Sequence, residues 1–164
     1  MNTGPDAFPA AYVAVLDLLN RFTDTVNRRD WPALQALFCE DGVWDVGGPD
    51  AGAYASYFEG AAAVAAGIES LVSTFEFLVQ TNHAPVIEIS GRRAAARSTI
   101  HEFMRPAGGG GITVLGSYAD EIVQEGDDRW RFKKRSFRFV YVDTTPLTGQ
   151  VMARPQGGTL GCMA

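Results

Sequence analysis

The first part of the chain carries apolar residues at the spacing of a helix. Between residues 10 and 28, five apolar side chains fall on one helical face: Val15, Leu18, Leu19, Phe22 and Val26. A second, short helix is expected after Asp30, because Pro32 suits a first helical turn. Its apolar face would consist of Trp31, Leu34, Leu37 and Phe38.

The pattern becomes less regular toward the middle of the chain. Residues 42–45 indicate a brief strand, and residues 46–57, rich in glycine, aspartate and alanine, indicate a loop. An alanine-rich segment at 61–71 favours a third helix, which the pattern allows to continue, with a break, to Val79.

Four strand-like runs follow at 84–90, 94–104, 112–123 and 129–142, separated by turn-forming segments. Helices followed by consecutive antiparallel strands predict an α+β domain, with the helices packed on one face of a curved sheet. No linker or repeat divides the chain, so residues 1–164 are expected to form one domain with its core at about 10–142. Residues 143–164, which contain Pro146, Pro155 and several glycines, indicate an extended tail that could cover a neighbouring subunit.

The strands at 94–104 and 112–123 mix polar and apolar residues on both faces, unlike a sheet that only covers a core. Polar groups among aromatic and aliphatic side chains are typical of a small-molecule cavity. His101 and Glu102 are adjacent, so only one of them can point into such a cavity. The sequence leaves open which one does.

Composition narrows the class of protein. Hydrophobic residues make up 46% and charged residues 20% of the chain, as in ordinary globular domains. The net charge is −5 and the longest basic run is the triplet 133–135, which argues against nucleic-acid binding. No apolar run approaches the roughly 18 residues of a membrane span, and the N-terminus lacks the pattern of a signal peptide. We therefore expect no membrane partner.

The cysteines and histidines carry a further expectation. Cys39 and Cys162 lie far apart, which favours a reducing cytoplasm over a disulfide framework. The two histidines, His83 and His101, have no spacing typical of metal ligands, so no metal is expected.

Three segments together resemble a known family. They are residues 21–45, with Arg21-Phe22-Thr23-Asp24 at their start; residues 82–89; and residues 116–121 followed by 130–132. Over residues 13–142 the chain resembles the SnoaL-like branch of the nuclear transport factor 2-like superfamily. That resemblance implies a cone-shaped α+β barrel, in which a strongly curved, mostly antiparallel sheet and N-terminal helices enclose a deep apolar pocket.

The resemblance also implies a function. Enzymes of the family include scytalone dehydratase, bile-acid dehydratase, steroid Δ-isomerase, polyketide cyclases and dehydrochlorinases, most of which use no cofactor. The expected activity is that of a lyase or isomerase, acting by proton abstraction on a small hydrophobic, cyclic or aromatic, oxygenated molecule. The family implies a homo-oligomer, a trimer or a dimer. The alternative is a non-catalytic binding or dimerisation module, because fold alone does not settle function.

Matching the family's functional positions gives a mixed result. The family's helix-end Asp corresponds to Asn27 and its His to Gln80, so the Asp–His dyad is missing. A Tyr of the isomerases and cyclases corresponds to Phe22. Their strand Asp corresponds to Asp120, and the acidic residue of the bile-acid enzyme corresponds to Glu102. Asp120 is therefore the first candidate for general base, since a carboxyl in an apolar pocket has a raised pKa.

Side-chain chemistry adds other candidates. Tyr118, on the face of Asp120, could donate a hydrogen bond to a developing oxyanion. The resemblance implies that the region of Asp45, beside Trp44, borders the pocket. Arg138 could bind an anionic oxygen. His83, His101 and Glu102 are the other candidate bases.

Each of these residues also has a structural interpretation. Asp45 could cap a loop, Arg138 could form a surface ion pair, His83 could bond the backbone and Asn27 could cap its helix. Asn27 and Gln80 could instead orient a substrate, although an amide cannot act as a base.

Overall fold

The computed structural model describes residues 7–48 and 51–152, and within these residues helices precede most of the sheet. The helices are α1 (Ala7–Arg28), α2 (Trp31–Gln35) and α3 (Ala61–Val72), with one 3-10 turn at Gly52–Tyr54. The strands are β1 (Phe38–Val46), β2 (Ser56–Glu59), β3 (Phe75–Asn82), β4 (Val86–Ser90), β5 (Arg93–Pro106), β6 (Ile112–Gln124) and β7 (Trp130–Asp143).

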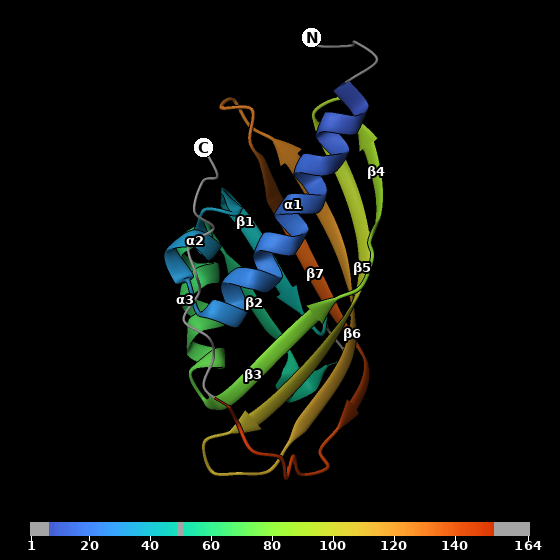
Figure 1. Ribbon diagram of the computed structural model, residues 1–164. Coiled ribbons are helices and arrows are strands. Elements are labelled where there is room, and N and C mark those ends of the chain that lie inside the picture. The colour runs from blue at the N-terminus through green and yellow to red at the C-terminus, as the bar shows by residue number, and fades with distance from the viewer. Residues whose placement is uncertain (1–6, 49–50, 153–164) are drawn as a thin grey trace, which may run out of the picture.

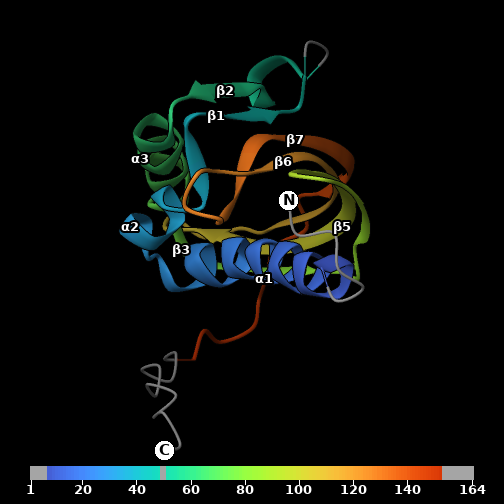
Figure 2. The same cartoon turned by 90° about the horizontal axis from the view of Figure 1, so that it is seen from above.

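The strands form one strongly curved sheet in the order β2-β1-β7-β6-β5-β3. The long strands β5, β6 and β7 form the predicted antiparallel meander, and β1 joins β7 in parallel. The first half of β5 pairs with β4 and its second half with β3. Figure 1 shows α1 lying across the concave face, and Figure 2, seen from above, shows α3 closing another side. This is the expected cone-shaped α+β fold.

Helix α1 buries the predicted apolar face. Each of its five apolar side chains is at most 4% exposed: Val15, Leu18, Leu19, Phe22 and Val26. The helix ends at Arg28, and Arg29 turns the chain with a positive φ of 58°. Asp30 then caps α2 by accepting a hydrogen bond from the Ala33 amide at 3.1 Å, with Pro32 in the first turn as expected.

The middle of the chain differs from the prediction in three places. The second helix is shorter than expected, because Phe38 begins β1 and pairs with Phe132 of β7. The brief strand at 42–45 is therefore longer, and the predicted loop at 46–57 contains the 3-10 turn and the first two residues of β2. The continuation of the third helix to Val79 was wrong: residues 75–82 form β3, because β5 extends beyond β4 and its second half needs a partner.

Beyond β7 the described part of the tail has no regular structure. It returns to the turn between β5 and β6, where the Leu147 amide donates to the Gly110 carbonyl at 3.1 Å. Arg105 also donates to the Gly149 carbonyl at 2.7 Å. The rest of the tail, 153–164, lies outside the described residues. None of the helices in the described segments is long and apolar enough to cross a membrane.

Candidate active site

A cavity of about 280 Å³ lies between the concave face of the sheet, α1 and α3. Most of its lining is aliphatic or aromatic, with Ile68, Leu71 and Val72 contributed by α3 and Phe137 and Phe139 by β7. No lysine, arginine or histidine occurs among the described residues that line it. An apolar cavity without cationic side chains suits an uncharged organic molecule better than a phosphate-bearing cofactor.

Five of the residues singled out from the sequence line this cavity: Phe22, Trp44, Gln80, Glu102 and Tyr118. Glu102, and not His101, is thus the member of that adjacent pair that faces the cavity. The amide of Gln80 and the carboxyl of Glu102 come from neighbouring strands, since Gln80 of β3 and Glu102 of β5 are register partners.

Glu102 is the only carboxylic acid among the described lining residues. Its Oε1 accepts a hydrogen bond of 2.9 Å from Nε2 of Gln80. Burial among apolar side chains raises the pKa of Glu102 to about 7, although the hydrogen bond from Gln80 favours the charged form and opposes the shift. A carboxyl with such a pKa can both accept and return a proton near neutral pH.

Asn27 positions Gln80 from the end of α1. Its Nδ2 donates to the Gln80 carbonyl at 2.9 Å, and its Oδ1 accepts from the Gln80 amide at 2.8 Å. Asn27 therefore does not line the cavity but holds the strand from which Gln80 reaches Glu102. Asn27 and Gln80 thus form a chain of hydrogen bonds that ends on the carboxyl of Glu102.

Tyr118, from β6, is 3% exposed and lies beside the rings of Phe22 and Phe137, at centroid distances of 5.8 and 5.1 Å. Burial raises the pKa of its hydroxyl above the usual value, Arg135 opposes this shift, and Glu102 adds to it. Tyr118 thus remains a neutral hydrogen-bond donor at physiological pH.

Asp120 is buried but does not line the cavity. It faces Arg135 of β7, with 3.7 Å between Oδ2 and NH1, and both side chains are inaccessible to solvent. Burial raises the pKa of Asp120 to about 6, and the charge of Arg135 opposes that shift. The structure therefore places the first candidate base behind the cavity rather than in it.

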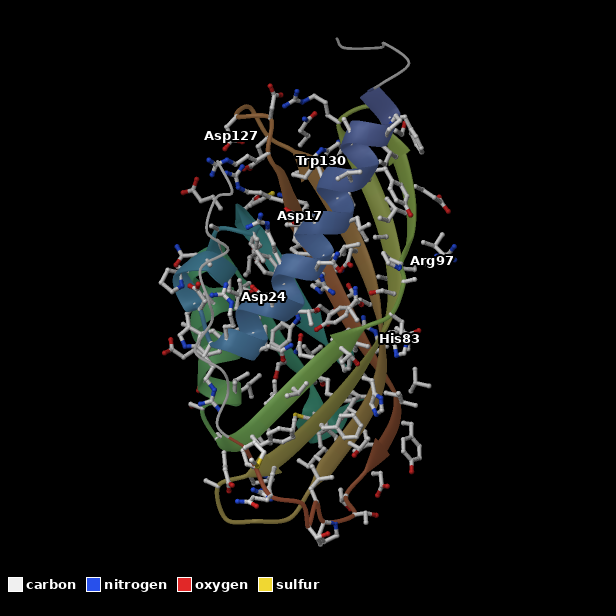
Figure 3. The ribbon with its side chains drawn as sticks, in the orientation of Figure 1. Asp17, Asp24, His83, Arg97, Asp127 and Trp130 are labelled. Carbon is white, nitrogen blue, oxygen red and sulfur yellow. The ribbon has the colours of Figure 1, made fainter. Side chains whose placement is uncertain are left out.

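The four other candidate residues lie away from the cavity. Asp45 and Arg138 form an ion pair of 2.8 Å between neighbouring strands β1 and β7. His101 packs on Phe103, with ring centroids 4.2 Å apart. His83 is exposed at the connection between β3 and β4 (Figure 3), where its backbone amide donates to Thr99.

Sequence reasoning missed Arg135, the largest fully buried side chain. Strict alternation along β7 would place Arg135 and Phe132 on opposite faces. The register shifts between the Lys134 and Phe132 pairings, so an extra residue is accommodated there and both side chains face inward. The basic triplet at 133–135 was the only signal, and it was used only to argue against nucleic-acid binding.

The described residues contain no group of three or more His, Cys, Asp or Glu side chains that could hold a metal ion. The polar side chains of the cavity can bind an organic substrate through hydrogen bonds, and the carboxyl of Glu102 can exchange a proton with it. These side chains are Gln80, Glu102, Tyr118, Tyr54 and Ser56.

Comparisons with known proteins agree with this architecture. No curated protein matches the sequence. Among solved structures, the hexachlorocyclohexane dehydrochlorinase LinA-type3 from Novosphingobium barchaimii is similar with a TM-score of 0.73 and 20% identity, over 89% of this chain and 96% of that one. A proposed scytalone dehydratase from Novosphingobium aromaticivorans has a TM-score of 0.73 and 21% identity, over 95% and 99% of the two chains.

A third similar structure is that of a variant of Rv3472 from Mycobacterium tuberculosis, a protein of unknown function. It has a TM-score of 0.70 and 21% identity, over 85% of this chain and 78% of that one. At such identities these structures share the fold only. The family model of the SnoaL-like domain matches residues 10–136, which is most of the sequence. The chain therefore belongs to the SnoaL-like family of the nuclear transport factor 2-like superfamily.

Proposed function

We propose that the protein is a cofactor-independent lyase or isomerase that acts on a small, uncharged, cyclic or aromatic carbonyl compound. The observation that carries this proposal is Glu102, a carboxyl with a pKa of about 7 that Gln80 holds inside a mostly apolar cavity. Buried carboxyls with raised pKa values are typical general bases. The names of the similar dehydrochlorinase and dehydratase structures agree with proton-abstraction chemistry.

In the proposed reaction the carboxylate of Glu102 removes a proton from the carbon next to the carbonyl. The C–H electron pair forms a carbon–carbon double bond, and the carbonyl oxygen, now an enolate, accepts a hydrogen bond from Tyr118. Glu102 then returns its proton. In a β,γ-unsaturated ketone the proton returns to the γ-carbon and the carbon–carbon double bond migrates into conjugation. In a β-hydroxy ketone the proton goes to the hydroxyl: the enolate re-forms the carbonyl, the Cβ–O bond breaks, water leaves and a Cα–Cβ double bond remains.

The test does not require the natural substrate to be identified. Neutral mono- and bicyclic ketones are incubated with the protein in D₂O, and exchange of the proton next to the carbonyl is followed by NMR. We expect wild-type protein to catalyse exchange with at least one of them. Glu102→Gln, which keeps a partner for Gln80, should slow the exchange by about 100-fold or more.

Glu121→Gln is the matched control, because Glu121 is an exposed glutamate on the neighbouring strand β6. It should exchange the ketones at the wild-type rate. Unchanged exchange in Glu102→Gln would remove Glu102 from the reaction.

A binding module without catalysis is the second candidate, and it is favoured by the absence of an Asp–His dyad at Asn27 and Gln80. Ketones that raise the melting temperature of the wild-type protein without any exchange would decide for this candidate. Exchange that depends on Glu102 would decide against it.

We also propose a homo-oligomer, a trimer or dimer. The end of β7 exposes three large apolar side chains, Val140 at 69%, Tyr141 at 52% and Val142 at 37%. Apolar surface of this kind is commonly covered by another subunit. Light scattering at micromolar concentration should give a mass of two or three chains, and the mass of one chain would refute the proposal.

A further inference from the structure

Tyr118 lies on a buried cation. The guanidinium carbon of Arg135 is 3.7 Å from the centroid of the Tyr118 ring. Two further rings enclose the same group, Phe22 at 4.1 Å and Phe132 at 4.6 Å. Both Tyr118 and Phe22 line the cavity and Arg135 does not, so the cation is separated from the cavity by these rings.

The environment of Arg135 is unusual for a guanidinium. Its side chain is 0% exposed, and none of its three nitrogens has a hydrogen-bond partner among the described residues. The carboxylate of Asp120, at 3.7 Å, also lacks hydrogen bonds in that part of the chain. Buried arginines ordinarily use their planar fork in bidentate hydrogen bonds. Here the charge is held mainly by aromatic faces and by the attraction of Asp120.

We propose that Arg135 is a positioning residue for the reaction, whose charge beneath the Tyr118 ring strengthens the hydroxyl of Tyr118 as a hydrogen-bond donor to the substrate oxygen. This inference rests on the proposed function, because it assigns Tyr118 to the substrate oxygen. A positive charge near a phenol stabilises the phenolate form and so makes the O–H group more acidic. A more acidic donor gains more when negative charge develops on its acceptor.

The other charged groups around Tyr118 act in the opposite direction. Glu102 of β5 and Asp120 of β6 both raise the Tyr118 pKa, as does burial, whereas Arg135 of β7 lowers it. The facing residue of α1 is Phe22 and that of β7 beside Arg135 is Phe137, both uncharged. Arg135 is thus the charged group that opposes two carboxyls and desolvation, and the side chain of Trp44, as a hydrogen-bond donor, adds a smaller effect in the same direction. Asp120 in turn moderates the charge of Arg135.

This arrangement predicts that substitutions at Arg135 and at Asp120 shift the Tyr118 pKa in opposite directions. Arg135→Met removes the cation and should raise the Tyr118 pKa. Asp120→Asn leaves the cation unopposed and should lower it. If the Arg135–Asp120 pair served only to hold the strands together, the two substitutions would not shift the Tyr118 pKa in opposite directions. Phe132→Leu is the matched control, because it removes a ring packed on Arg135 but no charge.

The pKa is measured on full-length protein with 3,5-difluorotyrosine placed at position 118, whose phenol ionises at lower pH than that of tyrosine, by ¹⁹F NMR titration. We expect the Tyr118 midpoint to rise by about one pH unit in Arg135→Met and to fall by about half a unit in Asp120→Asn. Phe132→Leu should leave it unchanged. If Arg135→Met does not fold, Arg135→Lys replaces it; this variant keeps the charge and should show the wild-type Tyr118 midpoint. The proposal is then decided by Asp120→Asn, in which the Tyr118 midpoint should still fall.

An unchanged midpoint in both charge variants, or shifts of the same sign, would overturn the proposal. Since the titration uses no substrate, its outcome is independent of whether ketone exchange is observed. Where exchange is observed, Arg135→Met should lower kcat about tenfold while KM changes little, because the stronger hydrogen bond acts mainly on the developing oxyanion.

Discussion

Asn27 and Gln80 are joined by two hydrogen bonds across 53 residues of chain, one in each direction between the Asn27 amide and the Gln80 backbone. Gln80 lies in β3, the last strand of the sheet, so one edge of β3 has no neighbouring strand. The Asn27 side chain presents a donor and an acceptor in the manner of a peptide group and satisfies this edge. The end of α1 is thereby fixed to the strand that orients Glu102.

Replacing Asn27 should therefore cost stability. We expect Asn27→Ala to lower the free energy of unfolding by about 1–3 kcal/mol, because two backbone groups of Gln80 lose their partners. Urea denaturation measures the change. Asn20→Ala, at an exposed position of the same helix, should alter stability by less than about 0.5 kcal/mol. Equal effects of the two substitutions would show that the Asn27 contacts contribute nothing.

The raised pKa of Glu102 has a consequence for stability. Between pH 4.5 and about 7 the folded state keeps a proton on Glu102 that the unfolded state releases, so this residue makes the protein less stable as pH rises through that window. We expect Glu102→Gln to be more stable than wild type at pH 8, by on the order of 2–3 kcal/mol.

That advantage should largely vanish near pH 4.5, where Glu102 is protonated in the folded state and half protonated in the unfolded state. Denaturation of both proteins at pH 4.5, 6 and 8 measures the trend. A constant difference across this range would mean that Glu102 has an ordinary pKa.

Much of the fold could be predicted because, in many of its helices and strands, apolar residues recur with one clear spacing. The buried face of α1 and the four C-terminal strands follow from local patterns of apolar residues. Strand β3 could not be predicted in this way, since the segment 75–79 forms a strand only because the second half of β5 lies beside it. Tertiary pairing decided a local conformation that propensity left open.

The site was predicted less completely, for two physical reasons. The alternation of β5 alone did not show whether His101 or Glu102 points into the cavity. The cavity lies on the face of β5 that carries Ile100 and Met104, and Glu102 is on that face. The register shift in β7 between the Lys134 and Phe132 pairings turned Arg135 inward, against simple alternation. Asp120 was expected in the pocket, but it is buried outside the cavity lining, where it faces Arg135, a partner that was not foreseen.

The pH dependence of catalysis should report on Glu102 directly. If its carboxylate is the base, kcat/KM for ketone exchange should rise about tenfold per pH unit below pH 7 and level off above it. The rate is measured from pH 5 to 9 under conditions in which the protein stays folded. A midpoint below pH 5 would point to a base with an unperturbed carboxyl pKa instead.

Gly67 sets the distance between α3 and Phe58. A Cβ at this position would lie 2.5 Å from the Phe58 ring, which stacks on Trp44 of the cavity lining at 6.0 Å between centroids. Alanine would gain about 1 kcal/mol of helix propensity over glycine. The clash costs more, because overpacking a core contact costs typically 1–3 kcal/mol and the Phe58 ring is held against Trp44.

We therefore expect Gly67→Ala to destabilise the protein despite the better helix former, and to weaken ketone binding by moving Trp44. Ala66→Gly, at the exposed neighbouring position, measures propensity alone and should cost about 1 kcal/mol. The double variant Gly67→Ala, Phe58→Leu provides space for the added methyl group and should recover part of the loss. Thermal denaturation of the four proteins separates these effects, and a Gly67→Ala protein more stable than wild type would show that Phe58 moves aside without cost.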